Sequence, residues 1–224
     1  VGLLIMSTIL LLNLRSLPAV GMILSLIFMS MLFMIGFLGW LYHFTYSDHF
    51  VFSFINSSMP IVLLTIANSD GVHILSRFFR EARKQKDVKQ AITLTMRKLL
   101  LPIFLTSITT SAAFLTMLSS PITPMTGYGL AIGFGILWAW ILSATFLPAV
   151  ISLKKWDFST AALTKSSFLE NMVHIFGNNI LKRPKIVLSI GIIIVFIASL
   201  GIRYINVEVN LVNLFKPGNT IRES

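Results

Sequence analysis

Long apolar runs separated by short polar stretches constrain this chain more than any other feature. Six such runs occur, at residues 1–12, 18–41, 52–76, 99–118, 125–153 and 186–202. A helix needs about 20 predominantly apolar residues to cross the hydrocarbon core of a membrane. The runs therefore predict a partial span followed by complete ones. With 55% hydrophobic residues, 12% charged residues and a mean hydropathy of +0.85, the chain is expected to be an all-α integral membrane protein, a polytopic helix bundle.

Two further features of the chain bear on its class. Val1 stands inside an apolar run and Ser224 ends a polar segment, so we expect a fragment of a longer protein. Cysteine is absent, which excludes a disulfide framework, thiolate chemistry and Cys-based metal sites within this stretch.

Basic residues fall in alternate loops and thereby predict the orientation of the spans. Arg15 follows the first run, eight Lys and Arg residues lie at 77–98, and six lie between 154 and 185, whereas 42–51 and 119–124 contain none. Because Lys and Arg concentrate in cytoplasmic loops, the three basic stretches are predicted to be cytoplasmic. The net charge of +10 then indicates topology and contact with anionic lipid rather than nucleic-acid binding.

Two of the predicted cytoplasmic stretches have helical patterns. Residues 80–98 are charged at first and apolar toward the next run, which predicts one helix. A Ser, Thr, Ala and Lys linker at 159–167 precedes apolar residues at helical spacing, namely Phe168, Met172, Ile175, Phe176 and Ile180. These apolar residues predict an amphipathic helix that lies either at the membrane interface or against its own protein.

Asp70 is the acidic residue that the pattern places inside a span. It lies six residues before Ser76, the predicted end of its helix, which is roughly 9 Å along the axis. A carboxylate at membrane depth costs a few kcal/mol and generally belongs to an ion path, a proton relay or a polar helix contact. His73 is one turn away on the same face, and Asn68 precedes the carboxylate. We therefore expect Asp70 and His73 to carry protons, and Asn68 could line the same cavity and support the relay.

Other interpretations of the same residues stay open. The role of Asp70 could be limited to joining helices through a hydrogen bond. His73 could be an interfacial residue that binds water or lipid headgroups. Metal ligation by these two side chains is a weak hypothesis, because two ligands do not close a site.

The following spans are rich in hydroxyl groups and glycine. Hydroxyl side chains let helices pack closely or hold water near a carboxylate. The run at 99–118 contains five of them: Thr106, Ser107, Thr109, Thr110 and Ser111. Packing is the simpler interpretation, but Thr106, Thr109 and Thr110 could support a proton path that faces Asp70. In the next span a small-residue face for helix packing is predicted from Gly127, Gly129, Gly133 and Gly135, and Pro148 predicts a kink.

No enzyme constellation is visible. The sequence contains no paired carboxylates in a span, no GxSxG motif, no nucleotide-binding loop and no His/Cys cluster. We therefore expect neither an enzyme nor a cofactor or metal. A pump without a nucleotide site has to draw its energy from an ion gradient.

In their order and spacing, four segments resemble the resistance-nodulation-division (RND) superfamily, and within it the exporters of the mycobacterial membrane protein large (MMPL) type, which share the helical unit called the sterol-sensing domain. The segments are LRSLPA at 14–19, NSDGVHILSRFFREA at 68–82, LPIFLTSITTSAAFLTML at 101–118 and GYGLAIGFGILWAWILSATFLPAV at 127–150. Residues 1–153 then resemble helices two to six of a first transmembrane half. The resemblance further implies a cytoplasmic linker at 154–184, the first helix of a second half at 185–203 and the start of a second periplasmic domain at 204–224.

The resemblance implies a proton-relay role for Asp70. Members of the family often have a Tyr or a second Asp directly after this residue, where Gly71 stands here. This departure shifts attention to His73 and to a partner on the corresponding helix of the missing second half.

The resemblance also implies the function. It predicts a proton-motive-force-driven exporter of lipid-like, hydrophobic or amphiphilic substrates, in the bacterial inner membrane. Expected partners are membrane lipids, the substrate, protons, the missing second half and further copies of the chain, but no nucleic acid. The alternatives are a non-transporting, sterol-sensing-like lipid-binding or scaffold protein, and a protein-secretion accessory subunit of the same superfamily.

Overall fold

A computed structural model describes residues 2–52, 54–157 and 183–204 of the chain. The chain divides into two units, Val1–Glu170 and Asn171–Ser224. Every element in the described ranges is a helix, and these ranges contain no strand, which confirms the all-α prediction. The predicted amphipathic segment at 168–180 and residues 205–224 of the predicted periplasmic domain lie outside the described residues.

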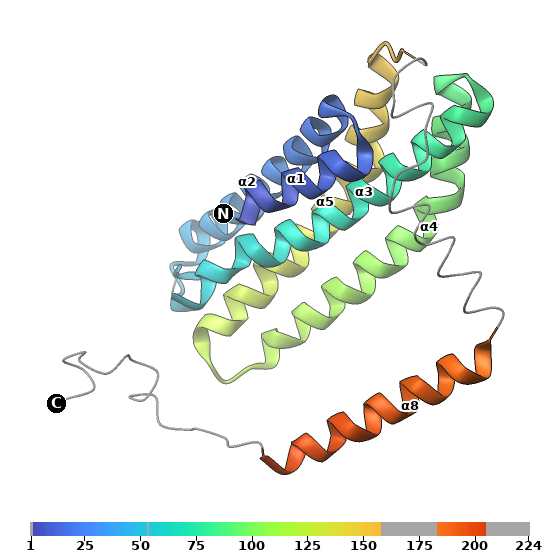
Figure 1. Ribbon diagram of the computed structural model, residues 1–224. Coiled ribbons are helices and arrows are strands. Elements are labelled where there is room, and N and C mark those ends of the chain that lie inside the picture. The colour runs from blue at the N-terminus through green and yellow to red at the C-terminus, as the bar shows by residue number, and fades with distance from the viewer. Residues whose placement is uncertain (1, 53, 158–182, 205–224) are drawn as a thin grey trace. The chain divides into compact units, whose positions relative to one another are not determined.

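The described residues of the first unit contain five α-helices that form one bundle (Figure 1). They are α1 (Gly2–Leu14), α2 (Leu17–Thr45), α3 (Met59–Gln85), α4 (Val88–Leu115) and α5 (Thr123–Leu153), and three short 3-10 helices connect them: η1 (Asp48–Phe50), η2 (Phe54–Ser58) and η3 (Thr116–Ser119). The second unit contains α8 (Pro184–Leu200) and η4 (Gly201–Tyr204). Each predicted apolar run within the described residues thus contains one α-helix.

Among the residues that the structure describes, four stretches are long and apolar enough to cross a membrane: Leu17–Thr45, Asp48–Gln85, Val88–Ser119 and Thr123–Leu153. The apolar helices α1 and α8 are shorter, with 13 and 17 residues. The chain is therefore a multi-pass helical membrane protein. Many large apolar side chains remain exposed on the bundle, for example Leu101 at 64% and Ile61 at 68%, as expected for surfaces that face lipid.

The turn between α3 and α4 differs from the prediction of one charged helix over residues 80–98. Helix α3 does not end near Ser76 but continues to Gln85. Lys86 then adopts a left-handed conformation with φ of 54°, and the Asp87 side chain accepts a hydrogen bond of 2.8 Å from the backbone N–H of Lys89, which caps the start of α4. The predicted single helix was wrong because a capping side chain and one left-handed residue interrupt it.

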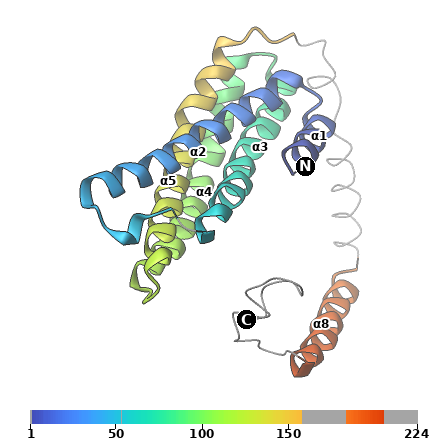
Figure 2. The same cartoon turned by 90° about the vertical axis from the view of Figure 1, so that its left-hand side faces the viewer.

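Helix α5 contacts α2, α3 and α4, and Figure 2 shows these helices in one bundle. It packs on α2 partly through stacked rings, with centroids 4.1 Å apart for Phe33 and Trp138 and 4.6 Å apart for Phe37 and Phe134. Helix α5 also continues through Pro148 to Leu153. Just beyond its end, the Trp156 ring packs on Phe78 of α3 at 5.3 Å.

The four predicted packing glycines are all buried, but they do not form one face. A Cβ at Gly127 would overlap the backbone carbonyl of His49, and one at Gly129 would overlap the carbonyl of Phe114. A Cβ at Gly133 would lie 3.0 Å from the Leu115 side chain, and one at Gly135 would lie 3.1 Å from Met34. The glycines therefore allow close approach of α5 to three different neighbours, namely the loop at η1, the end of α4 with η3, and α2.

Candidate functional site

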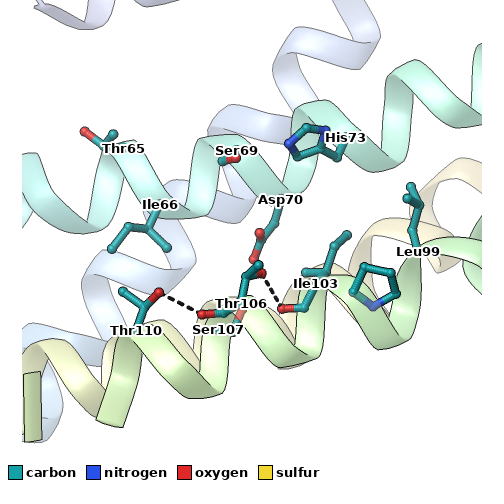
Figure 3. Close-up of a pocket in the computed structure, with 11 residues that line it drawn as sticks. Thr65, Ile66, Ser69, Asp70, His73, Leu99, Ile103, Thr106, Ser107 and Thr110 are labelled. Atoms are coloured by element: carbon teal, nitrogen blue, oxygen red, sulfur yellow. Dashed lines mark hydrogen bonds between the residues drawn. The ribbon is translucent and has the colours of Figure 1, made fainter. Parts of the chain in front are cut away.

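Asp70 lies on the buried face of α3. Its exposed fraction is only 6%, and the small residues Ala67 and Gly71 on either side of it are also buried. A Cβ at Gly71 would lie 3.1 Å from Ile23 of α2, so the glycine brings α3 close to α2. The residue after the carboxylate is thus used for packing, and the Asp70 side chain points from α3 toward α4 (Figure 3).

A cavity of about 470 Å³ lies between α3 and α4 around Asp70. From α3 it is lined by Thr65, Ile66, Ser69, Asp70 and His73, and from α4 by Leu99, Pro102, Ile103, Thr106, Ser107 and Thr110. Figure 3 shows these side chains along the two facing helices. The cavity combines a carboxyl group, an imidazole and several hydroxyl groups with apolar walls.

The carboxyl group of Asp70 is incompletely satisfied. Its oxygen Oδ2 is buried and has no hydrogen-bond partner among the described residues. The carboxyl group interacts with the hydroxyl group of Ser107. This contact does not reach full hydrogen-bond geometry, so Ser107 Oγ also has no hydrogen-bond partner within the described part of the chain. Buried polar atoms normally have partners, so this pair of atoms is suited to receive a proton, a water molecule or an ion.

The predicted threonines separate into two groups. Thr106 and Thr110 line the cavity, and each donates its hydroxyl proton to its own helix, to Ile103 O at 2.8 Å and to Thr106 O at 2.7 Å. Their hydroxyl oxygens remain able to accept hydrogen bonds inside the cavity. Thr109 is exposed and does not line the cavity; its hydroxyl donates to Leu105 O at 2.8 Å. Of the three threonines that could support a proton path, Thr106 and Thr110 thus line the cavity and Thr109 does not.

The other two predicted residues also differ in position. His73 lines the cavity, at its end nearest the α3–α4 turn. Asn68 does not line it, although its side-chain oxygen is buried without a hydrogen-bond partner among the described residues. The structure thus brings Asp70, His73, Thr106 and Thr110 together and leaves out Asn68 and Thr109.

Two residues of this region were not selected from the sequence. Ser107 follows Ile103 and precedes Ser111 at four-residue spacing, and all three are buried on α4; this spacing could have identified Ser107 as the hydroxyl facing the bundle. Glu81 was counted among the charged residues of a cytoplasmic helix, but its exposed fraction is 4%. Its burial could not be predicted because the charged pattern concealed the packed face of α3.

A metal centre finds no support in the arrangement. Within the described ranges, no group of three or more His, Cys, Asp or Glu side chains could hold a metal ion.

Comparisons with known proteins agree with the architecture. The chain is 32% identical over 104 residues to Protein dispatched homolog 1 of Mus musculus, a stretch that covers 46% of this chain and 7% of that protein. The Homo sapiens protein of the same name is 30% identical over 104 residues, again 46% of this chain and 7% of the relative. The chain thus matches only a small part of these much longer relatives. The family model described as the MMPL family matches residues 1–200, and the chain therefore belongs to the MMPL family of RND-superfamily membrane proteins.

Proposed function

We propose that this chain is the ion-carrying part of an exporter driven by the proton-motive force. The observation that supports the proposal is the buried Asp70 carboxyl group with an unpaired oxygen in a hydroxyl-lined cavity between two membrane spans. A buried carboxyl group that binds and releases a proton converts between a neutral and a charged state. The two states favour different surroundings, because an unpaired charge at membrane depth is costly.

The exchange of a proton at Asp70 alters the contact between α3 and α4. In the neutral state the carboxyl group fits an apolar interface with little polar support. In the charged state the carboxylate requires donors, and the closest source within the cavity is the Ser107 hydroxyl, aided by water held near Thr106, Thr110 and His73. Loading and release of the proton therefore change how tightly the two helices pack.

The proposed substrate is lipid-like, hydrophobic or amphiphilic; the support for this part of the proposal is membership of the MMPL family, rather than a substrate site on the described helices. Transport domains outside this chain would convert the α3–α4 movement into movement of the substrate. The bacterial inner membrane stays a prediction of the family resemblance; the two relatives compared above are mouse and human proteins.

Substitution of Asp70 by Asn in the full-length protein tests the proposal. The amide keeps the size of the side chain but cannot exchange a proton, so gradient-driven export is expected to fall to background while insertion into the membrane is unchanged. Thr109→Val serves as the matched control, because it removes a hydroxyl outside the cavity. It is expected to export like the natural protein.

Two outcomes would contradict the proposal. Undiminished gradient-driven export by the Asp70→Asn protein would show that Asp70 does not carry the coupling proton, whereas absence of export by the natural protein, together with lipid-dependent binding of a partner, would favour a non-transporting, lipid-binding scaffold. Export that follows an imposed sodium gradient, and ignores an imposed proton gradient, would keep Asp70 as the ion-binding group but replace the proton, since carboxylate and hydroxyl oxygens also bind alkali cations.

A further inference from the structure

We propose that Glu81, held by Arg77 and Lys98, forms an ionic gate that closes the Asp70 cavity toward the predicted cytoplasmic side. The proposal rests on the proposed function, because a gate has meaning only if Asp70 exchanges protons. It adds a role for Glu81, Arg77 and Lys98, which lie outside the cavity lining.

The three residues follow the cavity lining along both helices. On α3, Asp70, His73, Arg77 and Glu81 are spaced by three, four and four residues, so they share one face of the helix. On α4, Lys98 directly precedes Leu99, which lines the cavity. Since α3 and α4 are joined by the short turn at Lys86 and Asp87, the charged residues lie between the cavity and this turn. They therefore lie at its predicted cytoplasmic end.

The contacts of Glu81 join the two helices. Its oxygen Oε1 lies 2.9 Å from Arg77 Nη2 on the same helix and 3.6 Å from Lys98 Nζ on α4. The side chain of Glu81 is 6% exposed, whereas that of Lys98 is 54% exposed. A buried carboxylate requires such partners, because an unpaired charge in the interior is strongly unfavourable. Lys98 thus connects a buried charge on α3 to the solvent-facing edge of α4.

The arrangement explains how the gate can open. Arg77 binds Glu81 through one nitrogen, and its buried Nε has no hydrogen-bond partner among the described residues. The carboxylate therefore keeps Arg77 as an intrahelical partner when Lys98 moves away. Separation of Lys98 from Glu81 would widen the space between α3 and α4 beside His73 and Leu99, and water could then reach Asp70 from this side.

A purely structural role for Glu81 makes a different prediction. If the ion pairs only held α3 to α4, their loss would lower the stability of the protein and reduce export without creating a proton path. If the ion pairs form a gate, their loss is instead expected to let protons cross the membrane without substrate, by way of Asp70.

The test measures passive proton influx into liposomes that contain the full-length protein, under an imposed pH difference and without substrate. Glu81→Gln and Lys98→Met are each expected to raise the influx, by about tenfold for Glu81→Gln, the factor given by a barrier lower by about 1.4 kcal/mol. Lys84→Met is the matched control, because it removes one exposed basic residue from the same end of α3. Its influx should equal that of the natural protein.

The double variants Asp70→Asn with Glu81→Gln and Asp70→Asn with Lys98→Met decide the route. An influx that returns to the natural level supports the gate, and an influx that stays high overturns it, because the protons would then bypass Asp70. If the Glu81→Gln protein does not fold, the Lys98→Met protein alone tests the gate, because the Lys98 side chain is half-exposed and its replacement disturbs the packed interior less. Unchanged influx in the single variants also overturns the gate, even where Asp70→Asn has abolished export and upheld the proposed function.

Discussion

The position of Asp70 depends on small residues on one side of it and on hydroxyl groups on the other. Gly71 lets α3 approach Ile23 of α2, which pushes the carboxyl group toward α4 and the cavity. A side chain at position 71 would begin 3.1 Å from the Ile23 side chain, so a Tyr or Asp there would require Ile23 to shift. The residue that departs from the family pattern is thus explained by packing against α2.

Ser107 is predicted to support the charged state of Asp70. A hydrogen bond to a charged group contributes about 1.5–3 kcal/mol, so Ser107→Ala should slow gradient-driven export by roughly tenfold or more. Ser107→Thr, which keeps a hydroxyl group, should retain most of the rate. Initial export rates of the full-length variants, normalised to the amount of inserted protein, provide the measurement. Equal rates for Ser107→Ala and the natural protein would show that Asp70 works without this hydroxyl.

At the scale of elements, the contact between α4 and α5 depends on Gly129. A Cβ at this position would overlap the Phe114 carbonyl oxygen and lie 2.6 Å from Met117 Cβ, and a backbone carbonyl cannot move aside as a flexible side chain can. Gly129→Val should therefore destabilise the protein by about 1–3 kcal/mol. Thermal unfolding in detergent measures the loss. Gly36→Val is the control, since a Cβ at Gly36 meets nothing within 4 Å; equal melting temperatures of the two variants would contradict the prediction.

The start of α4 depends on Asp87. Its side chain accepts a hydrogen bond from the Lys89 N–H, and loss of such a cap costs about 0.5–2 kcal/mol. Asp87→Ala should lower the melting temperature, whereas Asp87→Asn, which also caps helices well, should have little effect. The same unfolding assay separates the two variants. Equally lowered melting temperatures for Asp87→Asn and Asp87→Ala would show that the charge rather than the cap matters.

The sequence predicted which segments are helical better than it predicted which way each helix faces and where the turns between helices lie. Apolar runs mark helices because lipid requires them, and each described α-helix overlaps one predicted run. The rotation of α4 was harder to predict, since its hydroxyl groups surround much of the helix. The four-residue spacing of Ile103, Ser107 and Ser111 was the available signal, and the packing shows that Ser107 lines the cavity while Thr109 does not. The turn at Lys86 and Asp87 was missed because charged residues on both sides concealed it.

At the scale of the whole molecule, the basic residues predict which ends of the helices face the cytoplasm. The chain contains no cysteine, so a single one can be introduced as a probe, with any cysteines elsewhere in the full-length protein replaced. Lys89 and Ser119 are exposed at opposite ends of the α4–η3 stretch. A membrane-impermeant maleimide applied to intact cells should label Ser119→Cys and not Lys89→Cys. In inside-out vesicles the result should reverse, and the opposite pattern would invert the topology.

The length of α3 has a mechanical consequence. Its 27 residues form a rod of about 40 Å at 1.5 Å per residue, whereas the hydrocarbon core is about 30 Å thick. Roughly 10 Å of continuous helix therefore extends beyond the hydrocarbon at the charged end. The Trp156 ring packs on Phe78 near this end. Asp70 and Glu81 lie on the same uninterrupted helix. A tilt of α3 that begins at the carboxyl group therefore also displaces the charged end of the helix.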